Sequence, residues 1–411
     1  MLLFATRIMN VIIVNDHSYL AGGVSRVAIS EAIGLSRMGM QVTFFSGKGP
    51  ADPELINSDV NLVCLSQQDF LERSGKLGAS VAGFHNWTAC RSLADFLKTK
   101  DPLQTVVHYH SWMKVLSPAI LGVARARGFR SVLTLHDFFI NCPNGGLINY
   151  QSNQICKLKP LSVQCLSTHC DSRSFGHKCW RSLRGLYQAH AVKPFETIDK
   201  ILAVSELCRE KVIEGTEAEP RIDVLLNPID LAPAAPAPVG QNEHFVFVGR
   251  LSPEKGLPVL LDAIRGTDIK LRIIGEGPIA TDHSLTNVEW LGWLSPENVM
   301  AEIRQARALV FPSIWYETFG LTAFEAMAHG VPVVVSDCTA TAGYIEDGVT
   351  GLHFRRCDTT QLQQQLSAID QSSELATTIG NNAFNWFKAS GLDLSSHVDK
   401  LLNFYEELVS S

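Results

Sequence analysis

Short apolar segments that favour β-strands alternate with segments of helical periodicity along most of this chain. Near its start, a buried strand is predicted at 7–16, a helix ending in glycine at 24–39, and a second strand at 41–47. Such a strand–helix–strand unit gives two parallel strands joined by a right-handed crossover. Further strands of this type are expected at 105–110, 131–137 and 200–205. The first half of the chain is therefore predicted to be a doubly wound α/β domain.

A stretch rich in proline and alanine, "LAPAAPAPVGQN" (231–242), interrupts the alternation. Proline can neither extend a helix nor donate a hydrogen bond in a central strand, so this stretch is expected to connect two domains. The alternation then resumes, with strands expected at 244–250, 270–277, 288–293, 308–313 and 331–337 and helices at 257–266 and 296–306. The second half is predicted to be doubly wound as well.

The length of the chain also calls for two domains, because single cores stop growing efficiently at roughly 250–300 residues and this chain has 411. We expect two Rossmann-like domains, at 1–226 and 227–390, and a last helix in 391–411 that packs back across both. Ligands of such sheets bind outside the carboxyl ends of the strands, so the expected site is a cleft between two facing domains.

The composition excludes several classes of protein. With 18% charged residues and a net charge of -6, the chain has no broad basic surface for nucleic acid. The opening "MLLFATRIMNVIIVND" is interrupted by Arg7 and Asn10 and lacks a cleavage site, so it is interpreted as a first strand rather than a signal peptide. No apolar run approaches the roughly 20 residues that cross a bilayer. A cytoplasmic protein is expected, with peripheral contact at the inner membrane face left open.

Gly22 and Gly23 lie in the loop between the first expected strand and helix. Backbone without side chains can approach a ligand closely, and the amides at a helix start favour an anion such as phosphate. A tight turn without a ligand is the alternative. A nicotinamide cofactor is not favoured, because the full G-x-G-x-x-G spacing is missing.

The segment "VGRLSPEKG" (248–256) places Arg250 at the carboxyl end of a strand and Lys255 just before a helix. A planar guanidinium and a compact ammonium at one edge of a sheet can neutralise a diphosphate. Solvated surface charge is the alternative, and the position at the ligand end of a strand favours the binding role.

Two glutamates surround a Phe-Gly turn in "PSIWYETFGLTAFEAMAHGVPVVVSD" (312–337). Glu317 is expected on a loop, and Glu325 lies one turn into the helix that starts near Gly320. The free amides of that first turn can receive phosphate oxygens, and a carboxylate one turn in can hold ribose hydroxyls. The alternatives are a solvated loop acid at Glu317 and compensation of the helix dipole at Glu325.

Taken together, Gly22-Gly23, "VGRLSPEKG", "GEG" (275–277) and "ETFGLTAFEAMAHGVPVVVSD" (317–337) resemble the retaining glycosyltransferases of family 4. That family has the GT-B fold and an E-x7-E motif. The resemblance implies an N-terminal acceptor-side domain and a C-terminal domain that binds the nucleotide sugar. It extends from about residue 9 to residue 390 and says little about which sugar is transferred.

The resemblance also implies roles for single residues. Arg250 and Lys255 would bind the donor diphosphate, Glu317 the sugar hydroxyls and Glu325 the ribose, while His136 in "LTLHD" would lie beside the transferred sugar. His110, in "VHYHSWM", is a weaker candidate for the last role. The expected catalytic residues are His136, Arg250, Lys255 and Glu317. The expected donor-binding residues are Gly22, Gly23, Arg250, Lys255, Glu317, Phe319, Gly320, Leu321, Thr322 and Glu325.

The implied reaction is transfer of a hexose from a nucleotide-sugar donor to a glycan or lipid-linked glycan, as in polysaccharide or lipopolysaccharide biosynthesis. An epimerase or phosphorylase of the same fold, or a non-catalytic subunit that binds sugar nucleotides, is the alternative. No D-x-D metal motif is evident, so no metal or other cofactor is expected for catalysis.

The insert "NCPNGGLINYQSNQICKLKPLSVQCLSTHCDSRSFGHKCW" (141–180) holds five of the ten cysteines. Thiolates and imidazoles gathered in a loop-rich segment could hold a structural zinc ion, although no C-x2-C pair is present. Ordinary reduced thiols are the alternative. The zinc candidates are Cys142, Cys156, Cys165, Cys170 and Cys179, with His169 and His177 among them.

Overall fold

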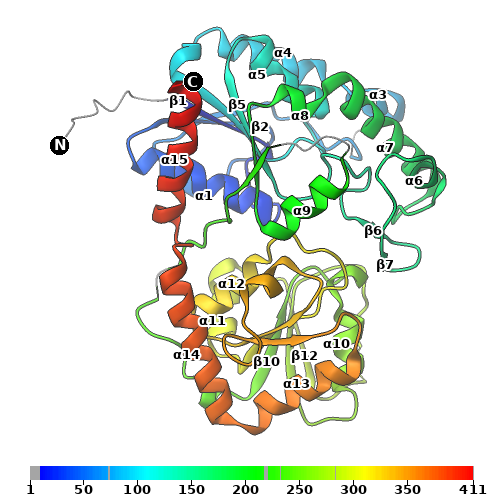
Figure 1. Ribbon diagram of the computed structural model, residues 1–411, viewed down its shortest axis with the longest axis vertical. Coiled ribbons are helices and arrows are strands. Elements are labelled where there is room, and N and C mark those ends of the chain that lie inside the picture. The colour runs from blue at the N-terminus through cyan, green and yellow to red at the C-terminus, as the bar shows by residue number, and fades with distance from the viewer. Residues whose placement is uncertain (1–9, 73–74, 217–220, 232, 283, 411) are drawn as a thin grey trace. The chain divides into compact units, whose positions relative to one another are not determined.

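The structure of this protein is a computed structural model that describes residues 10–72, 75–216, 221–231, 233–282 and 284–410. Its contacts divide the chain into two compact units. Unit 1 consists of Met1–Gly146, Leu158–Pro228 and Leu394–Ser411, and unit 2 of Leu147–Lys157 and Ile229–Asp393. Each unit is built on a parallel sheet with helices packed against it (Figure 1). The expected α/β architecture of two doubly wound Rossmann-like domains is confirmed.

Within the described residues, the sheet of unit 1 has seven parallel strands in the order β3-β2-β1-β4-β5-β8-β9. Its first strand begins at Asn10, and residues 7–9 of the predicted strand lie outside the described residues. Ile13 in β1 pairs with Phe44 on one side and with His108 on the other, and all three are fully buried. The strands are β1 (Asn10–His17), β2 (Gln41–Lys48), β3 (Asn61–Cys64), β4 (Thr105–Tyr109), β5 (Arg130–Leu135), β8 (Lys200–Ala203) and β9 (Ile222–Val224).

Helix α1 (Gly23–Arg37) covers part of this sheet, and α15 (Leu394–Ser410) packs against α1 (Figure 1). Gly34 allows this close packing, because a Cβ at that position would lie 2.8 Å from Cγ2 of Val398. The core of unit 1 therefore contains residues from both ends of the chain. The other helices of unit 1 are α2 (Pro53–Ile56), α3 (Lys76–Ala82), α4 (Trp87–Leu97), α5 (Val123–Ala126), α6 (Val163–Ser167), α7 (Phe175–Tyr187), α8 (Pro194–Thr197) and α9 (Glu206–Glu214).

The sheet of unit 2 has six parallel strands within the described residues, in the order β12-β11-β10-β13-β14-β15. The valine run in β14 is fully buried, as expected for a central strand covered on both faces. The strands are β10 (His244–Val248), β11 (Lys270–Ile274), β12 (Val288–Gly292), β13 (Ala308–Phe311), β14 (Val333–Ser336) and β15 (Leu352–Phe354). The helices are α10 (Leu257–Ile264), α11 (Pro296–Arg304), α12 (Leu321–Ala328), α13 (Thr359–Gln371) and α14 (Ser373–Ser390).

The stretch rich in proline and alanine packs against unit 2. The amide of Ala237 donates a hydrogen bond to the carbonyl of His329 at 2.8 Å, and Arg307 donates to the carbonyl of Gly240 at 2.9 Å. Apart from the short segment 147–157, the chain passes between the units after Pro228 and after Asp393. The sequence placed these boundaries at 226/227 and 390/391.

Part of the cysteine-containing insert groups with unit 2 rather than with the N-terminal domain in which the sequence placed it. Residues 147–157 form the short antiparallel pair β6 (Ile148–Asn149) and β7 (Gln154–Ile155). The side chain of Arg356 donates to the carbonyl of Asn153 at 2.9 Å, within unit 2. Among the described residues, no helix is both long and apolar enough to span a membrane.

Candidate donor site and histidine cluster

The loop that follows β10 is held against the segment that follows β13. Gly256 has a φ of +75°, and a Cβ there would lie 1.8 Å from the carbonyl oxygen of Pro312. The amide of Ile314 also donates to the carbonyl of Glu254 at 2.9 Å. Only glycine fits this close approach at positive φ, so Gly256 brings Lys255 to the loop that carries Glu317.

Lys255 and Glu317 meet directly. Nζ of Lys255 donates to Oε2 of Glu317 at 2.7 Å, and the same oxygen accepts from Nε1 of Trp315 at 2.9 Å and from Oγ of Ser313 at 3.3 Å. Burial alone would raise the pKa of Glu317, but Lys255 and these two donors outweigh it and hold the pKa below its ordinary value. The site therefore contains an ionised glutamate paired with an ammonium.

Arg250 has a carboxylate partner of its own. Its guanidinium pairs with Glu254, and its Nε donates to Oγ of Ser252 at 3.3 Å. The side chain of Arg250 is 61% exposed and that of Glu254 only 3%. The structure therefore brings Lys255 to Glu317, but it gives Arg250 a separate and more solvated ion pair.

The turn before α12 is fixed by packing. Phe319 is buried and stacks on Phe324, with 4.5 Å between ring centroids, and its carbonyl accepts from Oγ1 of Thr341 at 2.6 Å. Gly320 precedes the helix with a φ of +91°, and a Cβ there would lie 2.4 Å from Oγ1 of Thr341. The amides of Leu321 and Thr322 follow in the first turn of α12, where helix amides lack intrahelical partners.

Glu325 lies one turn into α12, and its residue is only 2% exposed. Glu317, at the surface end of the same segment, has a side chain that is 15% exposed.

Unit 1 contains a cavity of about 180 Å³ at the amino-terminal end of α1. Gly22 and Gly23 line it, together with Lys114, His110 and Asp137. Nothing lies within 4 Å of where a Cβ of Gly22 would be, so this glycine borders open space. The size and the lining suit a small polar ligand.

The cavity wall is held in place by Asp16 at the end of β1. Its carboxylate accepts from the amides of Lys114, Val115 and Leu116, each at 2.9 Å. Burial raises the pKa of Asp137, on the same wall, to about 6. Asp137 therefore keeps its proton to a higher pH than an ordinary aspartate does.

His136 follows β5 and His110 follows β4. The Nε2 of His136 and the Nδ1 of His110 lie 3.0 Å apart, and the two rings stack with 5.2 Å between centroids. Burial, with a further contribution from His110, lowers the pKa of His136 to about 3. His136 is thus a neutral imidazole at physiological pH, and of the two rings His110 is the one that lines the cavity.

Sequence reasoning missed a buried polar cluster behind these histidines. Glu31 of α1 lies at its centre, with His108 of β4 and His397 and Tyr405 of α15 around it. Among the described residues, one group of side chains could hold a metal ion, namely Glu31, His108 and His110, whose donor atoms lie within 4.8 Å of one another. Polar residues at inward-facing helix positions were the available signal, since Glu31 interrupts the apolar stripe of α1.

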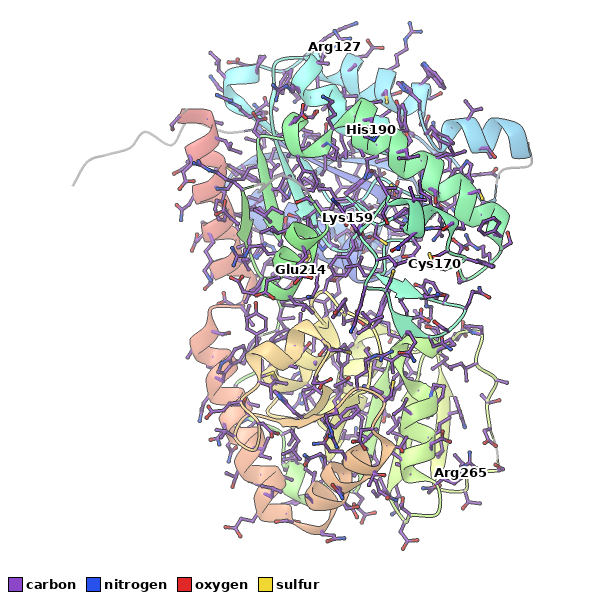
Figure 2. All side chains as sticks on the ribbon, turned by 45° about the vertical axis from the view of Figure 1, so that its right-hand side comes forward. Arg127, Lys159, Cys170, His190, Glu214 and Arg265 are labelled. Atoms are coloured by element: carbon purple, nitrogen blue, oxygen red, sulfur yellow. The ribbon has the colours of Figure 1, made fainter. Side chains whose placement is uncertain are left out.

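The zinc candidates of the insert lie in different environments. Cys142, Cys165 and Cys170 are buried, whereas Cys156 is half-buried and Cys179 is exposed. Figure 2 labels Cys170. Within the described residues these thiols do not form a group of three with metal-ligand spacing.

The buried ammonium of Lys178 lies beside these thiols. Its Nζ donates to Sγ of Cys165 at 3.6 Å. Burial lowers the pKa of Lys178, but the neighbouring Cys170, Cys165 and Cys142 outweigh it and raise the pKa.

Comparison with known proteins identifies two family matches. The family described as Glycosyltransferase Family 4 matches residues 21–233, more than half of the chain, and the family described as Glycosyl transferases group 1 matches residues 230–386. The crystal structure of HepE from Anabaena in complex with UDP and glucose superimposes with a TM-score of 0.68 at 16% identity, covering 97% of this chain and 100% of that chain. At that identity the likeness concerns the fold.

Two curated relatives match parts of the chain. An uncharacterised glycosyltransferase of Methanocaldococcus jannaschii is 28% identical over 203 residues, or 46% of this chain and 56% of that protein. A phosphatidyl-myo-inositol mannosyltransferase of Mycobacterium leprae is 30% identical over 227 residues, or 51% of this chain and 59% of that protein. The chain thus spans between half and two thirds of the length of these relatives.

Proposed function

This chain belongs to glycosyltransferase family 4, and we propose that it transfers a hexose from a nucleotide-sugar donor to a glycan or lipid-linked glycan, with retention of configuration at the sugar. The observation that carries the proposal is the Lys255–Glu317 pair beside the first turn of α12. Donor binding at this place requires cations and amides for the diphosphate and a carboxylate for the sugar.

The arrangement suits departure of a nucleoside diphosphate. As the bond to the sugar breaks, negative charge builds up on the leaving phosphate, and preorganised donors act where that charge develops. Lys255 supplies an ammonium, and Leu321 and Thr322 supply helix amides. Arg250, which is the most exposed of these groups, can turn from Glu254 to the phosphate.

Glu317 has the features of a positioning carboxylate. Lys255, Trp315 and Ser313 all donate to Oε2, and among the described residues no hydrogen bond to Oε1 competes with a sugar hydroxyl. To Glu325, one turn into α12, we assign the ribose hydroxyls. In unit 1 we assign to His136 the place beside the transferred sugar, and to Gly22 and Gly23 the role of close backbone approach to a phosphate.

The acceptor is proposed by class. The relative from Mycobacterium leprae is named as a mannosyltransferase of phosphatidyl-myo-inositol, and the HepE complex contains UDP and glucose. These names support a nucleotide-sugar donor and a glycan or lipid-linked acceptor, and we place the reaction in polysaccharide or lipopolysaccharide biosynthesis. The same acceptor class implies a cytoplasmic enzyme with peripheral contact at the inner membrane face.

A donor screen tests the proposal. Calorimetric titration with UDP, GDP and their common sugar conjugates should identify one tight nucleotide sugar, and nucleoside diphosphate should be released when an acceptor is added. The anomeric configuration of the product, read by NMR, then tests retention. Release of diphosphate from no donor, or turnover only with free phosphate, would refute the glycosyltransferase proposal.

A further inference from the structure

We propose that Glu31 is a positioning residue that sets the tautomer of His136, acting through His110. The inference rests on the proposed function, because it assumes that His136 lies beside the transferred sugar. Glu31 belongs to α1, His110 follows β4 and His136 follows β5, so three separate elements form one polar chain.

The distances define this chain. Oε2 of Glu31 lies 3.3 Å from Nε2 of His110, and Nδ1 of His110 lies 3.0 Å from Nε2 of His136. Both facing atoms of the first contact are fully buried, and neither makes a hydrogen bond of regular geometry among the described residues. A buried donor or acceptor without a partner is costly, so the contact of 3.3 Å between these two atoms is the interaction that can satisfy both, since Nδ1 of His108, 3.7 Å from Oε2 of Glu31, already pairs with Tyr405.

The protonation of His397, which contacts the other oxygen of Glu31, is fixed by a backbone carbonyl. His397 of α15 has its Nδ1 2.8 Å from the carbonyl oxygen of Leu226 and its Nε2 3.0 Å from Oε1 of Glu31. Both partners accept hydrogen bonds, so the ring donates from both nitrogens and carries a positive charge. This charge compensates the carboxylate inside the fold.

Glu31 is ionised in this setting. Its side chain is only 2% exposed, and burial alone would raise its pKa. His110 and His397 outweigh burial and hold the pKa well below its ordinary value.

The charge on Glu31 determines the tautomers that follow. A lone pair on Nε2 of His110 would face the carboxylate and be repelled, so that nitrogen carries the proton. Because His397 already compensates Glu31, a second buried charge on His110 would have no counter-ion, so His110 is neutral and its Nδ1 accepts from Nε2 of His136. Because His136 is neutral, its own Nδ1 is left without a proton and acts as a hydrogen-bond acceptor.

A metal ion is the competing occupant of this cluster, and the structure argues against it. His108 would have to be the third ligand, but its Nδ1 lies 2.6 Å from the hydroxyl of Tyr405 and its Nε2 lies 2.7 Å from Oγ1 of Thr134. Both of its nitrogens are therefore engaged. A metal on Nε2 of His110 would also force the proton onto Nδ1 and reverse the bond to His136.

Two substitutions separate the role of Glu31 as an acceptor from its charge. In Glu31→Gln, neutral His397 still donates from Nδ1 to Leu226, so its Nε2 accepts from the new amide and the amide oxygen faces His110. The tautomer of His136 is thereby kept. In Glu31→Met no acceptor remains, and the pair of histidines is free to adopt either tautomer.

The experiment is long-range ¹H–¹⁵N NMR of protein labelled on histidine, with His136→Asn to assign the signal. The wild type and Glu31→Gln should show His136 protonated at Nε2, and Glu31→Met should show a mixture. Thr134→Val removes the hydrogen bond between Thr134 and His108 but leaves the contacts from Glu31 through His110 to His136 intact. This variant should match the wild type. His136 protonated at Nδ1 in the wild type, or stoichiometric metal in the purified protein, overturns the proposal even if no variant folds.

Kinetics provide the second readout. Glu31→Met should lower kcat by about 10²-fold with little change in KM for the donor, since general acid–base and hydrogen-bonding groups contribute on that order. Glu31→Gln should recover most of this loss, whereas a purely charge-based role predicts equal losses in both. Absence of sugar transfer by the wild type would refute the proposed function, and the NMR result would still decide the tautomer.

Discussion

Lys255 donates from Nζ to Oε2 of Glu317 at 2.7 Å, across 62 residues of sequence, and both side chains are mostly buried. The pair joins the loop after β10 to the loop after β13. The pair holds the ammonium beside the segment that leads into α12, where we place the donor diphosphate.

Replacing Lys255 by alanine should reduce turnover strongly. Removal of one preorganised donor from a developing anion typically costs roughly 2.7–4 kcal/mol, so kcat should fall by about two to three orders of magnitude. Steady-state assays with saturating donor test this. A Lys255→Ala enzyme with nearly normal kcat would show that the ammonium is not used in the reaction.

The same pair should make stability depend on pH. The folded-state pKa of Glu317 is lowered, so its contribution to stability is present above the ordinary pKa near 4.5 and is lost as pH falls through the folded value. In Lys255→Met, the ammonium that opposes the effect of burial on the pKa of Glu317 is gone. The loss of unfolding free energy should therefore be largest near pH 7, about 3 kcal/mol, and should shrink toward pH 4.

Urea denaturation across that pH range measures this difference. Lys270→Met is the matched control, because Lys270 pairs with Glu243 at 2.6 Å on the exposed surface of the same unit. The control should change stability far less at every pH. Equal pH profiles for the two variants would contradict the electrostatic account.

Gly256→Ala should be severely destabilising, because it combines a φ of +75° with a Cβ 1.8 Å from the carbonyl of Pro312. Gly266→Ala is the control, since Gly266 has a φ of +74° and nothing within 4 Å of the added Cβ. The control should cost about 1–2 kcal/mol of backbone strain, and Gly256→Ala should cost more than about 3 kcal/mol. Similar losses of unfolding free energy in both variants would mean that the loop carrying Lys255 can shift to accommodate the added methyl group.

Catalysis should survive removal of metal. No D-x-D motif supplies a metal site next to the donor residues, and Lys255 with the α12 amides can neutralise the leaving diphosphate. Dialysis against a chelator should leave kcat unchanged, measured with the same donor and acceptor before and after. Loss of activity that is restored by a divalent ion would disprove this expectation.

Much of the fold was predictable because parallel strands buried on both faces are apolar throughout. The strands around Ile13 and Val334 follow this rule. The short edge strands β3 and β15 did not follow it, since no residue of β3 is buried and only two residues of β15 are. Their pairing depends on the neighbouring strand rather than on their own pattern.

The site was predictable to the extent that its residues lie at strand ends. Position in the chain pointed to Lys255 and Glu317, but it could not show that Arg250 pairs with Glu254 or that Glu325 is buried. The contact of Glu31 with His397 spans 366 residues. No local pattern signals such a contact, because it depends on where the last helix packs.

That last helix has a consequence for biosynthesis. Leu401 and Tyr405 are fully buried in the core of unit 1, beside residues of α1. A ribosome makes α1 before unit 2 and α15 after it. The core of unit 1 therefore stays incomplete, with apolar residues of α1 exposed, until unit 2 has been synthesised. In the cell, this places the first-made part of the protein under the longest exposure to chaperones and proteases.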